Sequence, residues 1–196
     1  MSEKIILSSK EIKRGVKYCA NIINEKFCNQ NVVVVGIMDG GTYFTVDLTR
    51  ELDFEHTFKQ ISCKSYDNQK QGKVTIYSTL DPKDYQDKKI ILVDELYDTG
   101  NSVAEVKKHI IEQTGNSDIF VCTVFKKNKE SLPGLDLYAF LVPNVWLVGY
   151  GLDDNGTKRN YKYLCGKPTG SDKEDEKLFE SEEVFERVKK RMMEKI

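Results

Sequence analysis

The sequence is poor in several residue types on which common functional sites depend. Its 196 residues include two histidines, His56 and His109, and five cysteines without metal-ligand spacing. This argues against a zinc site and against a histidine-based catalytic triad. The formal net charge is −1, so the chain lacks the basic excess of nucleic-acid-binding proteins. No apolar run reaches the length of a membrane span, and the first residues do not read as a signal peptide.

These shortages predict a protein that binds neither nucleic acid nor membrane. The cysteine count is odd, and most of the cysteines lie in apolar or strand-like surroundings. Such a pattern is typical of reduced core thiols in a cytosolic protein, and we therefore expect a cytoplasmic location.

What the sequence does have is an alternation of strand-like and helical segments, in a chain long enough for one domain with a full core. This favours an α/β fold whose mostly parallel, twisted sheet is flanked by helices on both faces. Helices are expected after a cap at Ser8 or Ser9, over residues 42–52, and from residue 103 to a stop at Gly115. Strands are expected over residues 32–37, 56–63, 73–78, 90–93, 119–125, 137–140 and 145–150. The last strands follow one another without helices, so the sheet is expected to finish antiparallel.

The composition changes at the end of the chain. Residues 166–177 are polar and rich in turn formers, which is typical of a linker. Val184, Val188 and Met192 then recur every four residues, which predicts a short helix docked on the body or on another subunit; the alternative is a mobile tail. We therefore expect one domain over residues 1–166, followed by a polar linker and C-terminal helix over residues 167–196 that docks on it.

The most informative segment is IILVDELYDTGNS, residues 90–102. Four apolar residues predict a buried strand, and Asp94 and Glu95 follow directly. A third acid, Asp98, precedes Thr-Gly-Asn-Ser, after which apolar residues recur at helical spacing. The acids are therefore expected in a loop at the carboxyl end of a strand, where ligands bind in open α/β sheets.

The chemistry of this loop fits a phosphorylated sugar. Thr99 and Ser102 offer hydroxyl groups, and Gly100 lets the backbone approach a ligand closely. The start of the helix supplies free N–H groups and the positive end of a dipole. The paired carboxylates of Asp94 and Glu95 suit vicinal ribose hydroxyls or Mg²⁺. The alternative is an ordinary surface loop after a buried strand.

This segment resembles the 5-phosphoribosyl-1-pyrophosphate (PRPP) motif of type I phosphoribosyltransferases, and every typed position of that motif is met. In the family, four hydrophobic residues, two acids and two apolar residues precede D-T-G-x-[ST]. The resemblance implies a type I phosphoribosyltransferase-like fold with a small hood and a mobile loop. It also implies that the following residues bind PRPP or a nucleotide phosphate: Asp94, Glu95, Asp98, Thr99, Gly100, Asn101 and Ser102.

The turn Met38-Asp39-Gly40-Gly41 joins a predicted strand to a predicted helix, and the amides of its two glycines can bind an anion there. It resembles the pyrophosphate loop of hypoxanthine-guanine phosphoribosyltransferases, which typically reads L-K-G-G and carries a cis peptide. The matching bond here is Met38–Asp39. Asp39 replaces the family's lysine, and its carboxylate would repel pyrophosphate unless it points away. The backbone role of Gly40 and Gly41 is kept, and a side-chain role of Asp39 is left in doubt.

Two further motifs follow the family order. Ser65 and Tyr66 begin a polar loop and resemble the Ser-Tyr pair of the family's mobile loop, a lid that excludes water; the alternative is an exposed hairpin tip. Lys126 directly follows a predicted strand and matches the family lysine that donates to the 6-oxo group of the base. Lys127, the next residue, is the alternative candidate for this base-contacting lysine. The non-functional interpretation is a solvated lysine at the end of a strand.

The segment WLVGYGLDDNGTKR, residues 146–159, looks like the family's base and pyrophosphate segment. The match implies that Trp146 stacks on the purine and that the backbone at Leu147 contacts its edge. Asp153 would help to hold Mg²⁺, and Arg159 would join Gly40 and Gly41 in binding pyrophosphate. Without this match, a lone tryptophan is more often a core residue.

Together these motifs imply a purine salvage enzyme that converts hypoxanthine or guanine plus PRPP to IMP or GMP plus pyrophosphate. Asp98 would be the general acid/base facing N7 of the base, and Mg²⁺ would be held by Asp94, Glu95 and Asp153. The family's dimers and tetramers suggest a homodimer or homotetramer. Two alternatives stay open: a xanthine-preferring enzyme, and a non-catalytic protein of the same fold that senses PRPP or a nucleotide.

Overall fold

The computed structural model describes residues 3–65, 74–127 and 134–167 of the chain. Tyr66, half of the expected Ser-Tyr pair, lies outside the described residues, and so do the linker beyond residue 167 and the C-terminal helix expected after it. Within the described ranges, no helix combines the length and the apolar composition needed to cross a membrane.

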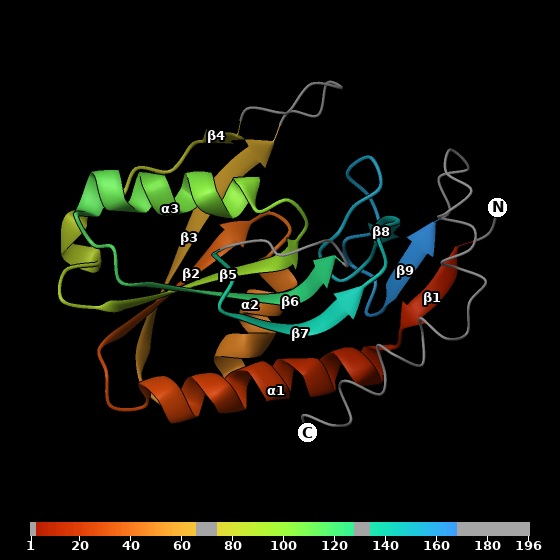
Figure 1. Ribbon diagram of the computed structural model, residues 1–196, viewed down its shortest axis with the longest axis horizontal. Helices are drawn as coiled ribbons and strands as arrows, with labels where there is room; N and C mark the ends of the chain where they lie inside the picture. Colours follow the sequence, from red (N-terminus) through yellow and green to blue (C-terminus); the bar gives the residue numbers. More distant parts are fainter. Residues whose placement is uncertain (1–2, 66–73, 128–133, 168–196) are drawn as a thin grey trace.

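The centre of the described fold is a six-stranded sheet with the order β4-β3-β2-β5-β6-β7 (Figure 1). Four of its pairs are parallel, and only β4 runs antiparallel to its neighbour β3. The mostly parallel sheet is therefore confirmed. Its strands are β2 (Val32–Met38), β3 (His56–Ser65), β4 (Val74–Ile76), β5 (Lys89–Tyr97), β6 (Ile119–Lys127) and β7 (Leu137–Val142).

The expected antiparallel finish is wrong for this sheet, because β7 pairs parallel with β6. That expectation assumed that a parallel return needs a helix. The connection of residues 128–136 can span about 30 Å when extended. This reach exceeds the length of the six-residue strand β7, so the chain is long enough for a parallel return.

The antiparallel strands instead form a small second sheet, with the order β1-β9-β8. It joins the two ends of the described chain, since β1 (Lys4–Leu7) pairs with β9 (Leu164–Lys167), which pairs with β8 (Trp146–Val148). Figure 1 shows this sheet beyond the arrowheads of β5 and β6. Strands β1 and β9 were not predicted from the sequence, since each is only four residues long.

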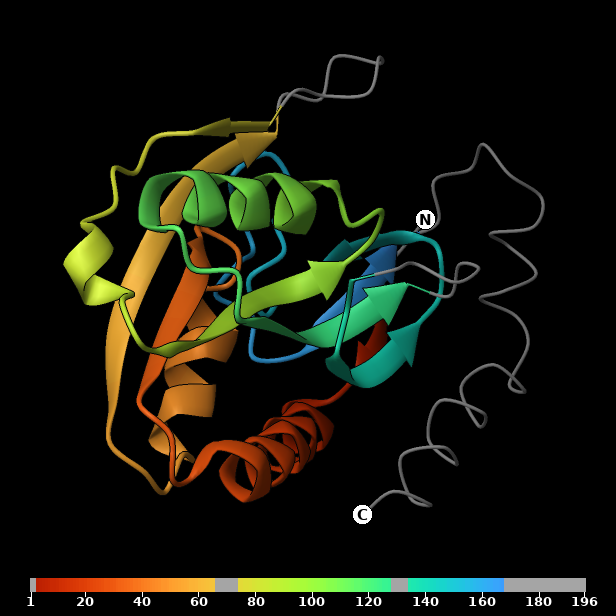
Figure 2. The same cartoon turned by 60° about the vertical axis from the view of Figure 1, so that its left-hand side comes forward.

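Helices cover both faces of the large sheet, as expected. Figure 2 shows α3 (Asn101–Thr114) on one face and α1 (Ser9–Phe27) and α2 (Thr42–Arg50) on the other. A short 3₁₀ turn, η1 (Pro82–Asp84), precedes β5. The predicted cap of α1 is Ser8, whose side chain accepts from the Glu11 N–H while the Glu11 carboxylate accepts from the Ser8 N–H. This reciprocal pair satisfies N–H groups at the start of the helix that have no partner within it.

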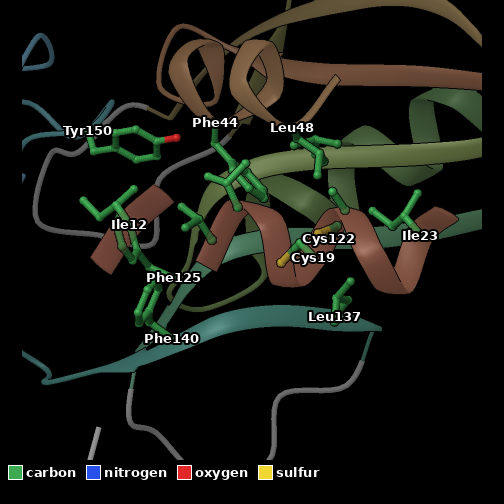
Figure 3. Close-up of a cluster of buried hydrophobic side chains, with 14 of the residues drawn as sticks. Ile12, Cys19, Ile23, Phe44, Leu48, Cys122, Phe125, Leu137, Phe140 and Tyr150 are labelled. Atoms are coloured by element: carbon green, nitrogen blue, oxygen red, sulfur yellow. The ribbon is translucent and has the colours of Figure 1, made fainter. Parts of the chain in front are cut away.

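The larger part of the core lies between α1, α2 and the sheet (Figure 3). Ile12 and Ile23 of α1 pack here with Phe44 and Leu48 of α2 against Phe125 and its neighbours in the sheet. Burying one such side chain contributes roughly 1.5–3 kcal/mol. This packing fixes α2 against β2 and β5, and so fixes the turn that joins β2 to α2.

Candidate active site

The carboxyl end of β5 carries the first acids of the site. The sequence placed Asp94 and Glu95 in a loop after the strand, but β5 continues through both acids to Tyr97. The strand continues because its ladder does, with Asp94 opposite Thr123 and Leu96 opposite Phe125 of β6. The two acids are therefore fixed by the sheet, and the loop begins at Asp98.

Asp94 and Glu95 form a crowded carboxylate pair. The Asp94 side chain is 8% exposed, and its Oδ1 accepts from the Glu95 N–H at 2.9 Å. Burial, and then the neighbouring Glu95 carboxylate, raise the pKa of Asp94 well above its usual range. Oε2 of Glu95 is buried without a hydrogen-bond partner among the described residues. Such a pair is suited to a ligand that brings hydroxyl donors or a cation.

The loop after β5 forms an open anion site. Gly100 has φ of 82°, and a Cβ there would lie 2.5 Å from the Tyr97 hydroxyl, so only glycine fits. In the described structure no side chain caps the start of α3. Thr99 and Asn101 are exposed, and Ser102 is half-buried at the first turn. The Asn101 N–H donates to Thr99 Oγ1 at 3.4 Å. Polar side chains therefore lie at the positive end of the α3 dipole, an arrangement that suits phosphate binding.

Asp98 and Lys127 form an ion pair next to this loop, with Lys127 Nζ 2.9 Å from Asp98 Oδ2. Neighbouring residues in a strand point to opposite faces. Lys126 accordingly turns elsewhere, with its Nζ 5.5 Å from the centre of the Tyr138 ring. Of the two lysines considered from the sequence, the structure thus brings Lys127 to Asp98.

The diglycine turn lies directly against the acids of β5. The Met38–Asp39 peptide is cis, as the resemblance implied. A Cβ at Gly40 would overlap the Glu95 carboxylate, and one at Gly41 would lie 2.5 Å from the Ile37 carbonyl oxygen. Close backbone approach therefore requires glycine at position 41, and a side chain at position 40 would displace the Glu95 carboxylate. The Asp39 side chain is exposed.

The turn after β8 completes the cluster. Arg159 donates through Nη1 to the Gly151 carbonyl at 2.6 Å and pairs through Nη2 with Asp153 Oδ1 at 2.8 Å. A Cβ at Gly151 would overlap the Gly40 carbonyl oxygen. The predicted pyrophosphate residues Gly40 and Arg159 therefore meet at Gly151, although they lie far apart in sequence.

The predicted metal ligands are not assembled into one cluster. Both Asp153 oxygens serve its own turn, one with Arg159 and the other with the Gly156 N–H. In the described ranges no three acidic, histidine or cysteine side chains are placed to hold a metal. Asp94 and Glu95 still fit Mg²⁺, which is commonly bound by one or two carboxylates together with waters and substrate phosphates. The unpartnered Glu95 Oε2 is consistent with this.

The predicted base-binding residues lie on β8. Trp146 is 46% exposed, whereas Leu147 is buried. Trp146 is therefore not a core residue, and its ring face is accessible for stacking. Ser65 ends the described part of β3, so the structure does not place the expected Ser-Tyr pair.

The family model of the phosphoribosyl transferase domain matches residues 2–155. The chain belongs to the phosphoribosyl transferase family. It is similar to the hypoxanthine-guanine phosphoribosyltransferase of Aquifex aeolicus, with 32% identity over 163 residues that cover 80% of this chain and 90% of the relative. The hypoxanthine phosphoribosyltransferase of Buchnera aphidicola is 27% identical over 82% of this chain and 92% of its own length.

Solved structures show the same fold for this family member. A hypoxanthine-guanine phosphoribosyltransferase from Bacillus anthracis aligns with a TM-score of 0.73 at 24% identity, over 85% of this chain and 99% of that one. A hypoxanthine phosphoribosyltransferase from Trypanosoma cruzi, solved with its product IMP, aligns with a TM-score of 0.70 at 18% identity. The predicted fold, the predicted enzyme class and the resemblance to the hypoxanthine-guanine group are confirmed.

Sequence reasoning missed two contacts in this phosphoribosyltransferase. One is the contact of Gly151 with Gly40, which the spacing of the glycines in Gly-Tyr-Gly could have suggested as a close approach. The other is a hydrogen bond from Tyr150 to Asp47 at 2.8 Å. No sequence signal announces it, because the two residues belong to separate elements.

Proposed function

We propose that this phosphoribosyltransferase transfers the phosphoribosyl group of PRPP to hypoxanthine or guanine, in the presence of Mg²⁺, and releases pyrophosphate. The observation that carries the proposal is the meeting of four features at one edge of the sheet. These are the Asp94–Glu95 pair, the open anion site at Gly100, the Gly40-Gly41 turn and the Asp98–Lys127 ion pair. The names of the relatives in Aquifex and Buchnera support the choice of base.

The proposed roles follow from the chemistry of each group. The ribose hydroxyls donate to Asp94 and Glu95, and Oε2 of Glu95 has no hydrogen-bond partner among the described residues. The 5′-phosphate binds the loop from Thr99 to Ser102 at the start of α3. The Gly40 N–H would receive pyrophosphate, whereas the Gly41 N–H donates to the Ile37 carbonyl oxygen at 3.0 Å and so shapes the turn. When bound at the acid pair, Mg²⁺ would offset the charge that develops on the leaving pyrophosphate.

Asp98 is proposed as the general acid/base that exchanges a proton with N7 of the base. Its partner Lys127, rather than Lys126, is proposed to donate to the 6-oxo group, because Lys127 is the lysine that faces Asp98. The exposed Trp146 would stack on the ring of the purine, and Arg159 would bind pyrophosphate oxygens. The lid role of Ser65 and Tyr66 remains a prediction. The boundary after residue 166, between the domain and the C-terminal segment, also remains a prediction.

A turnover assay tests this function. The protein is incubated with PRPP, Mg²⁺ and each of hypoxanthine, guanine, xanthine and adenine separately, with and without EDTA. IMP or GMP formation that EDTA abolishes is expected. Preference for xanthine would select the xanthine alternative. PRPP binding without turnover of any 6-oxopurine would favour the sensor.

Cytoplasmic location and self-association as a dimer or tetramer complete the proposal. The proposed location rests on the content of reduced thiols, and the proposed self-association rests on the dimers and tetramers of the family. Size-exclusion chromatography with light scattering measures the oligomeric state. A monomer at assay concentration would contradict the proposed self-association.

A further inference from the structure

A hydrogen bond joins the turn after β8 to helix α2, two elements that flank the candidate pyrophosphate site. The Tyr150 hydroxyl, in the turn after β8, donates to Asp47 Oδ2 of α2 at 2.8 Å across 103 residues of sequence. Tyr150 is 6% exposed, and its ring packs edge-to-face on Phe125 with centroids 6.1 Å apart. Burial and the adjacent carboxylate raise the pKa of Tyr150 above its usual value. The hydroxyl therefore stays protonated and remains a donor.

The backbone around Tyr150 is held in an unusual shape. Gly149, Tyr150 and Gly151 have φ of 96°, 48° and 104°, a conformation that a tyrosine adopts only when its surroundings impose it. Backbone bonds hold the turn, among them those from the Tyr150 N–H to the Tyr161 carbonyl and from the Gly151 N–H to the Arg159 carbonyl, both at 2.9 Å. The bond to Asp47 is the side-chain anchor of this turn.

The turn around Tyr150 contacts the residues that are proposed to bind pyrophosphate. The Gly151 carbonyl accepts from the Arg159 guanidinium at 2.6 Å, and Gly151 abuts the Gly40 carbonyl so closely that no Cβ would fit. Asp47 lies on α2, which begins at Thr42, directly after the diglycine turn. The contacts therefore close a ring: diglycine turn, α2, Asp47, Tyr150, Gly151, and back to the diglycine turn.

We propose that Tyr150 is a positioning residue, which through Asp47 sets the spacing between the Gly40-Gly41 turn and Arg159 and thereby the affinity for the pyrophosphate end of PRPP. The inference rests on the proposed function for the identity of the ligand. We expect Tyr150 to have no comparable effect on base binding, because β8 is held by its own ladder with β9. The predicted base residues Trp146 and Leu147 lie within that ladder.

The test removes the hydroxyl alone. In Tyr150→Phe the ring remains, and the affinity for PRPP and for pyrophosphate, measured calorimetrically with Mg²⁺, is expected to fall about tenfold. A tenfold change in affinity corresponds to the loss of one hydrogen bond to a charged group. KM for PRPP should rise with it, while KM for the base stays within about twofold. Binding of the base is followed through the fluorescence of the single tryptophan, Trp146.

Three further variants separate positioning from general destabilisation. Asp47→Ala should match Tyr150→Phe, and the double variant should be no worse than either single one. Asp47→Asn keeps an acceptor oxygen and should recover most of the PRPP affinity. Tyr85→Phe removes another buried tyrosine hydroxyl, which lies beside η1, and should leave PRPP affinity unchanged.

Two results would overturn the inference: unchanged PRPP and pyrophosphate affinity in both Tyr150→Phe and Asp47→Ala, or equal weakening of base and PRPP. If the wild type binds PRPP but turns over no base, the proposed transfer reaction fails. The calorimetric comparison then still decides the role of Tyr150.

Discussion

Replacing Lys127 by alanine should weaken the discrimination between 6-oxopurines and adenine. The Lys127 side chain is 14% exposed, and its ammonium is 2.9 Å from Asp98, so it can face a base held beside Asp98. An ammonium only donates, so it pairs with a 6-oxo group and opposes the 6-amino group of adenine. Losing such a buried hydrogen bond costs about 1–3 kcal/mol, or roughly 5- to 150-fold in affinity. We expect kcat/KM for hypoxanthine and guanine to fall by about this factor and the gap to adenine to narrow.

Lys126→Ala is the matched control, since it removes the same charge from the adjacent residue. Its ammonium lies over the Tyr138 ring, and we expect the 6-oxopurine preference to survive its loss. The assay is kcat/KM for hypoxanthine, guanine and adenine on the wild type and both variants. If Lys126→Ala abolishes the preference and Lys127→Ala does not, the structural assignment is refuted. If neither changes it, no lysine at this strand end selects the base.

The remaining predictions concern catalysis, the pyrophosphate loop and stability. Asp98→Asn should lower kcat by roughly 10²–10⁴-fold while KM for PRPP changes far less; a near wild-type kcat would remove Asp98 from the chemistry. Gly40→Ala forces a methyl group onto the Glu95 carboxylate, so KM for PRPP should rise at least about tenfold if the loop shifts by even 1 Å; unchanged PRPP kinetics would contradict the packing. Ser8→Ala breaks the α1 capping box and should cost about 0.5–2 kcal/mol in the free energy of unfolding by urea titration, with unaltered KM values; a change below that range would contradict the cap.

The local elements of the site were predictable because their signals are local. A buried run, paired acids and a glycine before a helix lie within residues 90–102, and the structure has a strand, a loop and a helix in that order. The end of β5 was misplaced because acids usually end a buried strand. Here the ladder with β6 keeps Asp94 and Glu95 in the strand.

The parts that escaped prediction depend on contacts between distant segments. Strand β1 has four residues and is held by β9, more than 150 positions away in sequence. The choice between Lys126 and Lys127 is a question of strand register, in which a shift of one residue reverses the face. Only the position of Asp98 on the neighbouring strand's loop settles which lysine faces it.

The charges of the candidate site explain why the proposal includes a divalent cation. Its described part holds the carboxylates of Asp39, Asp94, Glu95, Asp98 and Asp153. Its cationic side chains Lys127 and Arg159 are already paired, with Asp98 and Asp153 respectively. PRPP adds further negative charges, and the amides at the start of α3 offset about half an elementary charge. Burial and the adjacent Glu95 carboxylate raise the pKa of Asp94, which reflects the cost of ionising both carboxyl groups side by side. A cation bound to the pair offsets that cost and at the same time attracts an anionic substrate to this edge. Two hard carboxylates next to a phosphate-binding loop favour Mg²⁺ as this cation.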